Sequence, residues 1–343
     1  MSEDAAVPPM GPGAPPTLAL VGPTASGKTA LSLAVAERLG GEIISMDSRQ
    51  VYRGLDVGTA KATAAERARV PHHGLDLVEP SERFSAGAFA RYARAAIAAI
   101  GARGRLPLLV GGTGFFLRAL THPIFAEPPL PPERRAALRE RLSALSEEEL
   151  LRWLQALDAE AAQRLQRWGG RQRLLRALEL PLLTGRPLSW WQRHAPPAEP
   201  PLRPLVFALE LPRERLNAQI DARVEQMVAA GLLDEVRRLY AQGYAERSPG
   251  MNAQGYVELL PHLRGERTLD EALALVRRHT RHYARRQVTW FRHQLPPDAL
   301  RLDATRPRTE LAEEIGRRWD EFMRAAADRA RRSLTPDPRP LRS

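Results

Sequence analysis

One short stretch, GPTASGKT (Gly22–Thr29), says most about how this chain folds. Its spacing, G-x-x-x-x-G-K-[ST], is that of a loop whose backbone N–H groups cradle phosphates. The apolar run TLALV (17–21) before it predicts a buried strand, and KTALSLAVAERLG (28–40) after it predicts a helix that ends at glycine. A strand, a loop and a helix in this order predict a polyphosphate site at a helix N-terminus, but they do not identify the group attached to the phosphates.

Strand and helix signals continue to alternate along the chain. EIISM (42–46), LPLLV (106–110) and PLVFALEL (204–211) predict further strands, and FSAGAFARYARAAIAAI (84–100) predicts a helix. Such alternation predicts an α/β fold class, a P-loop NTPase-like parallel sheet flanked by helices. Ligands of these sheets bind beyond the carboxyl ends of the strands. The phosphate loop and two residues that follow strand ends, Asp47 and Thr113, should therefore converge on one rim.

The segment 123–201 differs in character from the sequence on either side. It is rich in Arg and Leu, has helical periodicity and is bounded by the proline clusters EPPLPPE and PPAEPP. We therefore predict an inserted helical subdomain over 123–201. The P-loop α/β core would consist of 17–122 and 202–330, and the second of these segments would include C-terminal helices. We predict that residues 1–16 and 331–343 are disordered tails.

The composition favours a polyanionic partner and excludes cysteine chemistry. The 343 residues carry a net charge of +11, which favours such a partner, although a basic surface without one is the simpler alternative. Zero cysteines exclude disulfides, cysteine nucleophiles and cysteine-based zinc sites. The N-terminus does not resemble a signal peptide, and no apolar run reaches about 18 residues. We expect a cytoplasmic protein without a membrane span, and a monomer.

The choice of cations supports a working phosphate loop. Of the 51 Lys and Arg residues only Lys28 and Lys61 are lysines. A compact ammonium can reach between phosphate oxygens where a planar guanidinium is too bulky. This explains why position 28 is a lysine in a chain that uses arginine almost everywhere as its cation. Lys61 has no such obvious role. The hydroxyl of Thr29 is the group that normally ligates Mg²⁺ in such loops.

Two other strand ends carry candidate chemistry. Asp47, in SMDSRQVYRG, could be a metal-side carboxylate, a general base or a turn cap. GGTG (111–114) allows close backbone approach, or forms a tight turn. The strand before it ends in Gly-Gly rather than in the acidic residues that orient hydrolytic water, which weakens the case for a hydrolysing NTPase. His72 and His73 are interpreted as structural or surface residues, since nothing nearby in the sequence makes a metal site.

A long basic segment near the C-terminus favours RNA. In LVRRHTRHYARRQVTWFRHQ, arginines recur at helical spacing with Tyr283, Trp290 and Phe291 between them. Arginine with aromatic side chains suits RNA backbone contact and base stacking. The alternative is a solvated basic helix face with a few core aromatics. Two more helices are predicted before it, one from about Arg213 and one in GLLDEVRRLYAQG.

Taken together and in order, several stretches resemble the bacterial tRNA dimethylallyltransferases, also called tRNA isopentenyltransferases or the IPP transferase family. These stretches are GPTASGKT, IISMDSRQVYRGLDVGTAK, LLVGGTGFFLRAL, RQRLLRALEL with TGRPLS, GLLDEVRRL with GYVELL, and TRHYARRQVTWFRHQ. The match covers roughly residues 17–295. It implies that the loop holds dimethylallyl diphosphate rather than ATP. It also implies transfer of the prenyl group to N6 of the adenosine 3′-adjacent to the anticodon, tRNA position 37, which is flipped out of its stack.

The resemblance also implies roles for particular residues. Asp47 matches the family's general base, Arg223 an arginine that neutralises the departing diphosphate, and Thr113 a threonine that lines the reaction channel. Mg²⁺ is expected at Thr29. The diphosphate-binding residues would be Gly22, Pro23, Thr24, Ala25, Ser26, Gly27, Lys28 and Thr29. The tRNA-contacting residues would be Asp47, Ser48, Arg49, Gln50, Arg135, Gln172, Arg173, Leu174, Leu175, Arg176, Arg285, Arg286, Gln287, Val288, Thr289, Trp290, Phe291 and Arg292.

The sequence departs from the family pattern in places, and other functions stay open. GGRQ precedes Arg173 where an Asn/Asp-containing turn is expected, and Asn252 and Gln254 stand where the family is apolar or small. The alternatives are an adenine-nucleotide prenyltransferase, a P-loop small-molecule kinase, and an RNA-binding module that uses the loop only as a phosphate clamp. ATP dependence would mark the kinase, and the basic C-terminal segment favours tRNA over free nucleotides.

Overall fold

The computed structural model describes residues 14–122, 125–126, 128–168, 170–196 and 199–334. Most of the predicted N-terminal tail, 1–16, and most of the predicted C-terminal tail, 331–343, lie outside these residues. The chain forms two compact units. The first combines Met1–Thr121 with Leu202–Ser343, and the second is His122–Pro201.

The first unit is built on a parallel sheet of six strands in the order β3-β2-β4-β1-β5-β6. The predicted α/β fold class is thereby confirmed. The strands are β1 Leu18–Val21, β2 Gly41–Ser45, β3 His72–His73, β4 Leu106–Gly111, β5 Leu205–Glu210 and β6 Leu300–Asp303. Sequence periodicity predicted β1, β2, β4 and β5 but missed the short edge strands β3 and β6. The phosphate loop thus follows one of the central strands.

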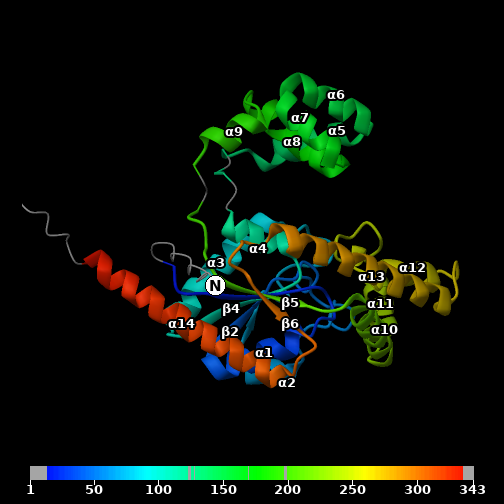
Figure 1. The fold of residues 1–343 in the computed structure, drawn as a ribbon. Helices are drawn as coiled ribbons and strands as arrows, with labels where there is room; N and C mark the ends of the chain where they lie inside the picture. The colour runs from blue at the N-terminus through cyan, green and yellow to red at the C-terminus, as the bar shows by residue number, and fades with distance from the viewer. Residues whose placement is uncertain (1–13, 123–124, 127, 169, 197–198, 335–343) are drawn as a thin grey trace, which may run out of the picture. The chain divides into compact units, whose positions relative to one another are not determined.

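Helices cover both faces of this sheet because alternate strand residues point to opposite sides. Leu18 and Leu20 of β1 pack with α1 (Lys28–Leu39) and α14 (Arg308–Leu334) in one core. Ala19 and Val21 belong to the other core, with α3 (Ala86–Ala102) and α4 (Gly114–Thr121) (Figure 1). The long α14, which lies along α1, was not resolved by the sequence analysis as a separate element.

The core that contains Ala19 and Val21 also includes side chains from a group of helices in the C-terminal half of the chain. Consecutive members of this group pack together, and α10 also packs on α13. They are α10 Arg213–Ala229, α11 Leu232–Ala241, α12 Tyr256–Leu263 and α13 Leu269–Gln294, with a 3-10 turn at Gly250–Asn252 and the short α2 Ala64–Arg69 elsewhere in the unit. The long basic helix predicted from the sequence is α13.

The second unit is a small helical body with its own core. Leu150 and Leu154 of one helix pack against Ala177 and Leu178 of another. Its helices are α5 Pro132–Ser143, α6 Glu147–Leu157, α7 Ala159–Trp168, α8 Arg171–Thr184 and α9 Leu188–His194. A capping box at Ser146, which exchanges hydrogen bonds with Glu149, starts α6. Across both units, the described helices include none with the length and apolar character needed to cross a membrane.

Candidate active site

The phosphate loop connects β1 to the N-terminus of α1. Ala25 and Gly27 adopt positive φ angles of 61° and 85°, which wind the loop tightly before the helix begins. The Ser26 N–H donates to the Pro23 carbonyl (3.3 Å), and the Lys28 ammonium donates to the same carbonyl (2.6 Å). The lysine therefore folds back over its own loop.

Asp47 stands in a sharp turn at the end of β2. Its Oδ1 accepts the N–H of Arg49 (2.8 Å), so the turn-cap interpretation is correct for one carboxylate oxygen. The N–H of Met46 still pairs with the sheet, donating to Val110 O (2.7 Å). Met46 is thus the last residue here whose N–H bonds to a neighbouring strand, and Asp47 is the first residue beyond it.

Thr113 anchors this turn. Its N–H donates to Met46 O (3.2 Å), and its hydroxyl oxygen accepts the N–H of Ser48 (3.1 Å). Thr113 is not among the residues that line the two cavities described below, and its channel-lining role stays a prediction. Gly111, two residues before Thr113, is required for this approach, because a Cβ at Gly111 would lie 2.2 Å from Met46 O.

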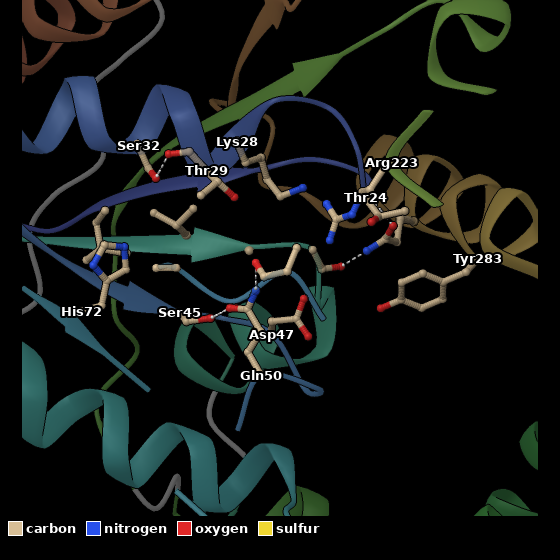
Figure 2. Close-up of a pocket in the computed structure, with 17 residues that line it drawn as sticks. Thr24, Lys28, Thr29, Ser32, Ser45, Asp47, Gln50, His72, Arg223 and Tyr283 are labelled. Carbon is tan, nitrogen blue, oxygen red and sulfur yellow. Dashed lines mark hydrogen bonds between the residues drawn. The ribbon is translucent and has the colours of Figure 1, made fainter. Parts of the chain in front are cut away.

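One cavity brings the phosphate loop, the Asp47 turn and α10 together. It is lined by Thr24, Lys28 and Thr29 from the loop, by Asp47, and by Arg223 from α10. Figure 2 shows the side chains of Lys28, Arg223 and Asp47 around the same space. The strand ends predicted to converge on one rim do so here, except that the third, after β4, contributes Gly111 and Gly112 rather than Thr113.

Burial gives this cavity unusual electrostatics. Burial and the nearby Arg223 lower the pKa of Lys28 to about 7, and Asp47 acts in the opposite direction. Burial also lowers the pKa of Arg223, again opposed by Asp47. Two cations share the space with a single carboxylate, so a dense negative charge entering it would relieve their repulsion.

A second cavity shares part of this wall and is more apolar. Thr24, Asp47, Arg223 and Tyr283 line both cavities. The second is also lined by apolar side chains of α10 and α13, namely Ile220, Val224, Met227 and Val276. Asp47 and Arg223 are therefore available both to a polyphosphate and to a group with an apolar surface.

The sequence analysis missed some residues of this site. Tyr283 was considered only for RNA stacking, yet it lines both cavities, and burial with the nearby Asp47 raises its pKa to about 12. His72 was interpreted as structural or surface, but it lines the first cavity from β3, and burial lowers its pKa. No spacing in the sequence singles out His72, because a strand of two residues has no periodicity.

The predicted tRNA contacts range from exposed through half-buried to buried. Arg285, Arg286, Thr289 and Arg292 of α13, with Gln172 and Arg173 of α8, are exposed. Leu174, Gln287 and Phe291 are buried, with exposed fractions of 5%, 6% and 5%, so these residues present little surface to solvent. For those three, contact with tRNA stays a prediction, since the resemblance identified the segments but not which side of each helix packs inward.

Two further predicted contacts are arranged around a buried carboxylate of the second unit. Arg135 and Arg176, together with Arg139, form ion pairs with Glu179. Glu179 is 1% exposed, and these arginines hold its pKa below the usual range against the effect of burial. Three arginine side chains therefore gather around this one buried carboxylate. Lys61, in contrast, is structural: its buried ammonium donates to Tyr52 O, Asp56 Oδ1 and Asp76 Oδ1 (2.5–2.7 Å).

The fold and site together define a P-loop protein that combines a polyphosphate cradle with an adjacent carboxylate and apolar cavity. The family model described as IPP transferase matches residues 50–294, and the one described as isopentenyl transferase matches residues 16–72. The chain belongs to the IPP transferase family.

Individual relatives agree with this assignment. A tRNA dimethylallyltransferase of Trichlorobacter lovleyi is 47% identical over 82% of this chain and 92% of its own length. The tRNA isopentenylpyrophosphate transferase of Bacillus halodurans has a similar structure, with a TM-score of 0.68 and 36% identity over 92% of this chain and 99% of that one. A eukaryotic dimethylallyltransferase acting on tRNA gives a TM-score of 0.74 and 28% identity over 84% of this chain and 74% of that one.

Proposed function

We propose that this protein transfers the dimethylallyl group of dimethylallyl diphosphate to N6 of the adenosine 3′-adjacent to the anticodon of tRNA, position 37. The products are N6-isopentenyladenosine and diphosphate. The family and the named activities of its relatives support the reaction class. The observation that carries the residue roles is that Lys28, Arg223 and Asp47, from three separate elements, line one cavity.

The chemistry assigns a separate task to each charge. The lone pair of N6 forms a bond to C1 of the dimethylallyl group as the C1–O bond breaks. The electron pair of the broken C1–O bond leaves with the diphosphate. Asp47 accepts the proton that N6 loses. Lys28 and Arg223 stabilise the charge that accumulates on the departing diphosphate, and their partial burial strengthens this effect.

The donor set also fits Mg²⁺. Thr29, at the start of α1, and Asp47 line the same cavity and offer a hydroxyl and a carboxylate oxygen. Within the described residues, no group of three or more His, Cys, Asp or Glu side chains could cage a metal alone. Mg²⁺ is commonly held by one or two side chains with substrate phosphates and water, and when bound it would neutralise part of the diphosphate charge. We assign this site to Thr29.

The tRNA would be held by the exposed arginines of α13 and by the arginine cluster around Glu179. These lie in different units, and each is a basic surface by itself. Arginine suits this task because its planar fork pairs with phosphate oxygens and stacks on bases. We expect the protein to act as a monomer in the cytoplasm.

The direct test is incubation with Mg²⁺, labelled dimethylallyl diphosphate and unmodified tRNA, without ATP. Labelled N6-prenyl adenosine in the anticodon loop would support donor, acceptor and ATP independence together. Label in free AMP or ATP instead of tRNA would favour the nucleotide prenyltransferase. Strict ATP consumption without transfer would favour a kinase.

The role of Asp47 has its own test. We expect Asp47→Asn to lower kcat by about 10²- to 10⁴-fold, because the amide cannot accept the N6 proton. Binding of tRNA, measured by filter retention, should stay within about threefold of the parent chain. Asp320→Asn, an exposed change on α14, is the matched control and should leave kcat unchanged. Full turnover by Asp47→Asn would rule out the general-base role.

A further inference from the structure

The phosphate loop and the Asp47 turn are carried by different strands, yet the reaction needs them at a fixed separation. The phosphate loop follows β1, and Asp47 follows β2. In the sheet order β4 lies between these two strands, so their ends are not direct neighbours. Something other than the sheet ladder must hold the loops beyond the strand ends in register.

The carboxamide of Gln287 bridges the first part of this gap. Its Oε1 accepts the N–H of Thr24 in the phosphate loop (2.8 Å), and its Nε2 donates to the carbonyl of Gly112 after β4 (2.8 Å). Gln287 is 6% exposed, so water competes little for these bonds. One side chain of α13 therefore uses both ends of its amide to tie two loops together.

Thr113 completes the connection to Asp47. It is the next residue after Gly112, and its two hydrogen bonds hold Met46 O and the Ser48 N–H on either side of Asp47. A path of hydrogen bonds, with the peptide bond between Gly112 and Thr113 as one step, thus runs from Thr24 through Gln287 to the Asp47 turn.

The glycines of GGTG are what allow α13 to take this position. A Cβ at Gly112 would lie 2.2 Å from Gln287 Nε2, and a Cβ at Gly114 would lie 2.3 Å from the ring of Trp290. At Gly112 and Gly114, the close approach expected from GGTG is therefore an approach by α13, the helix that also carries exposed arginines.

We propose that Gln287 is a positioning residue, which holds the phosphate loop and the Asp47 turn in register for transfer, and is not a tRNA contact. The proposal rests on the proposed function for its kinetic consequence. Loss of the bridge would leave both substrates bound but misplace the acceptor base relative to the donor diphosphate. Misplacement of about 1 Å can cost about a hundredfold in rate.

Gln287→Met tests the bridge with a side chain of similar length and no amide. We expect kcat to fall about 10- to 100-fold, while KM for tRNA and for dimethylallyl diphosphate stays within about threefold. Arg286→Gln, an exposed neighbour on α13, is the contrast and should raise KM for tRNA with little change in kcat. A Gln287→Met variant with kcat within about twofold of the parent, or with a raised tRNA KM and normal kcat, would overturn the proposal.

Gln287→Glu gives a readout that a merely structural role would not move. A carboxylate can accept from the Thr24 N–H but cannot donate to Gly112 O, whereas the protonated acid can do both. The kcat of Gln287→Glu relative to the parent chain, at saturating tRNA, should therefore rise as the pH falls. A ratio independent of pH would contradict the bridge, even if the methionine variant did not fold.

Amide hydrogen exchange separates this proposal from the proposed function. In Gln287→Met, exchange should accelerate at Thr24 and also at Ser48 and Thr113, at the far end of the path. Acceleration at Thr24 alone would show that Gln287 acts only locally, and would overturn the proposal without any assay of activity. Failure of the parent chain to prenylate tRNA would count against the proposed function instead.

Discussion

Lys28 is the side chain whose charge state depends most on what occupies the site. Its pKa of about 7 means that the Lys28 amine is only partly protonated near neutral pH when no phosphate is bound. A diphosphate beside it favours the charged form and raises this pKa. Binding should therefore be accompanied by proton uptake at pH values above about 7, and linkage requires that this contribution to affinity weakens as the pH rises further.

This shift can be observed directly because the chain has only two lysines. With selectively labelled lysine and no divalent cation, we expect one NMR signal to titrate with a midpoint near 7. Adding inorganic diphosphate should move that midpoint upward by at least about one pH unit. Lys28→Arg should remove the titrating signal and identify it. A midpoint near 10 without ligand would show that burial and Arg223 do not act on Lys28 in this way.

Sequence spacing alone located three residues that line one cavity in the structure, while their chemical roles stay predictions. G-x-x-x-x-G-K-[ST] placed Lys28 and Thr29, and the end of a strand placed Asp47. Gln287 was identified only as part of a basic segment, since nothing in the letters shows which helix face meets the sheet. Tyr283 was treated in the same way. A side chain whose role depends on a contact more than 150 residues away, as between Gln287 and Gly112, leaves no local pattern.

Among the elements, α11 has a structural role that its amphipathic pattern does not reveal. Glu235 is buried, and its carboxylate accepts the N–H groups of Asp56, Val57 and Gly58 and the hydroxyl of Tyr256. The loop that it holds leads directly to Thr59, whose carbonyl accepts from the Arg223 guanidinium (3.4 Å). Burial and Glu235 raise the pKa of Tyr256 far above its usual range, so Tyr256 remains a donor.

Replacing Glu235 by Gln should therefore be costly. The amide retains one acceptor oxygen and turns an NH₂ group toward backbone N–H groups, which leaves buried donors without partners. We expect the free energy of unfolding to fall by about 2–4 kcal/mol. Urea unfolding followed by circular dichroism measures the change. Asp234→Asn, the exposed neighbour on the same helix, should change it by less than about 0.5 kcal/mol. Equal effects of the two substitutions would refute the buried-acceptor account.

Elements with strong periodicity were predictable, and edge elements were not. β1, β4 and β5 are buried apolar runs of the kind that central parallel strands require. β3 has two residues and β6 alternates Leu with Arg and Asp, so neither resembles a buried strand. α14 is amphipathic, but the sequence predicted only that C-terminal helices exist in this region. Its sequence pattern does not indicate that it packs against α1.

Over the whole molecule, the excess of 11 positive charges should make tRNA binding strongly dependent on salt. We expect tRNA affinity to fall at least about tenfold between about 50 and 200 mM monovalent salt, as counterions are released. The double change Arg285→Gln with Arg286→Gln should lower the slope of log affinity against log salt. Arg317→Gln with Arg318→Gln removes the same charge from α14, where both arginines pair with Glu321, and should leave that slope nearly unchanged. Equal changes of the salt slope in the two double variants would show that tRNA responds to the net charge of the protein rather than to a docking surface on α13.

The way the second unit joins the first has a consequence for modularity. The N–H of Leu202 donates to Leu120 O (2.9 Å), so the chain leaves the core and re-enters it at one point. On the other side, the N–H of Ala126 donates to Pro196 O (2.8 Å). Because its two ends are paired in this way, the second unit can be exchanged between relatives, or shortened to a tight turn, without breaking a strand of the sheet. The second unit can therefore change in sequence or length while every strand of the sheet stays intact.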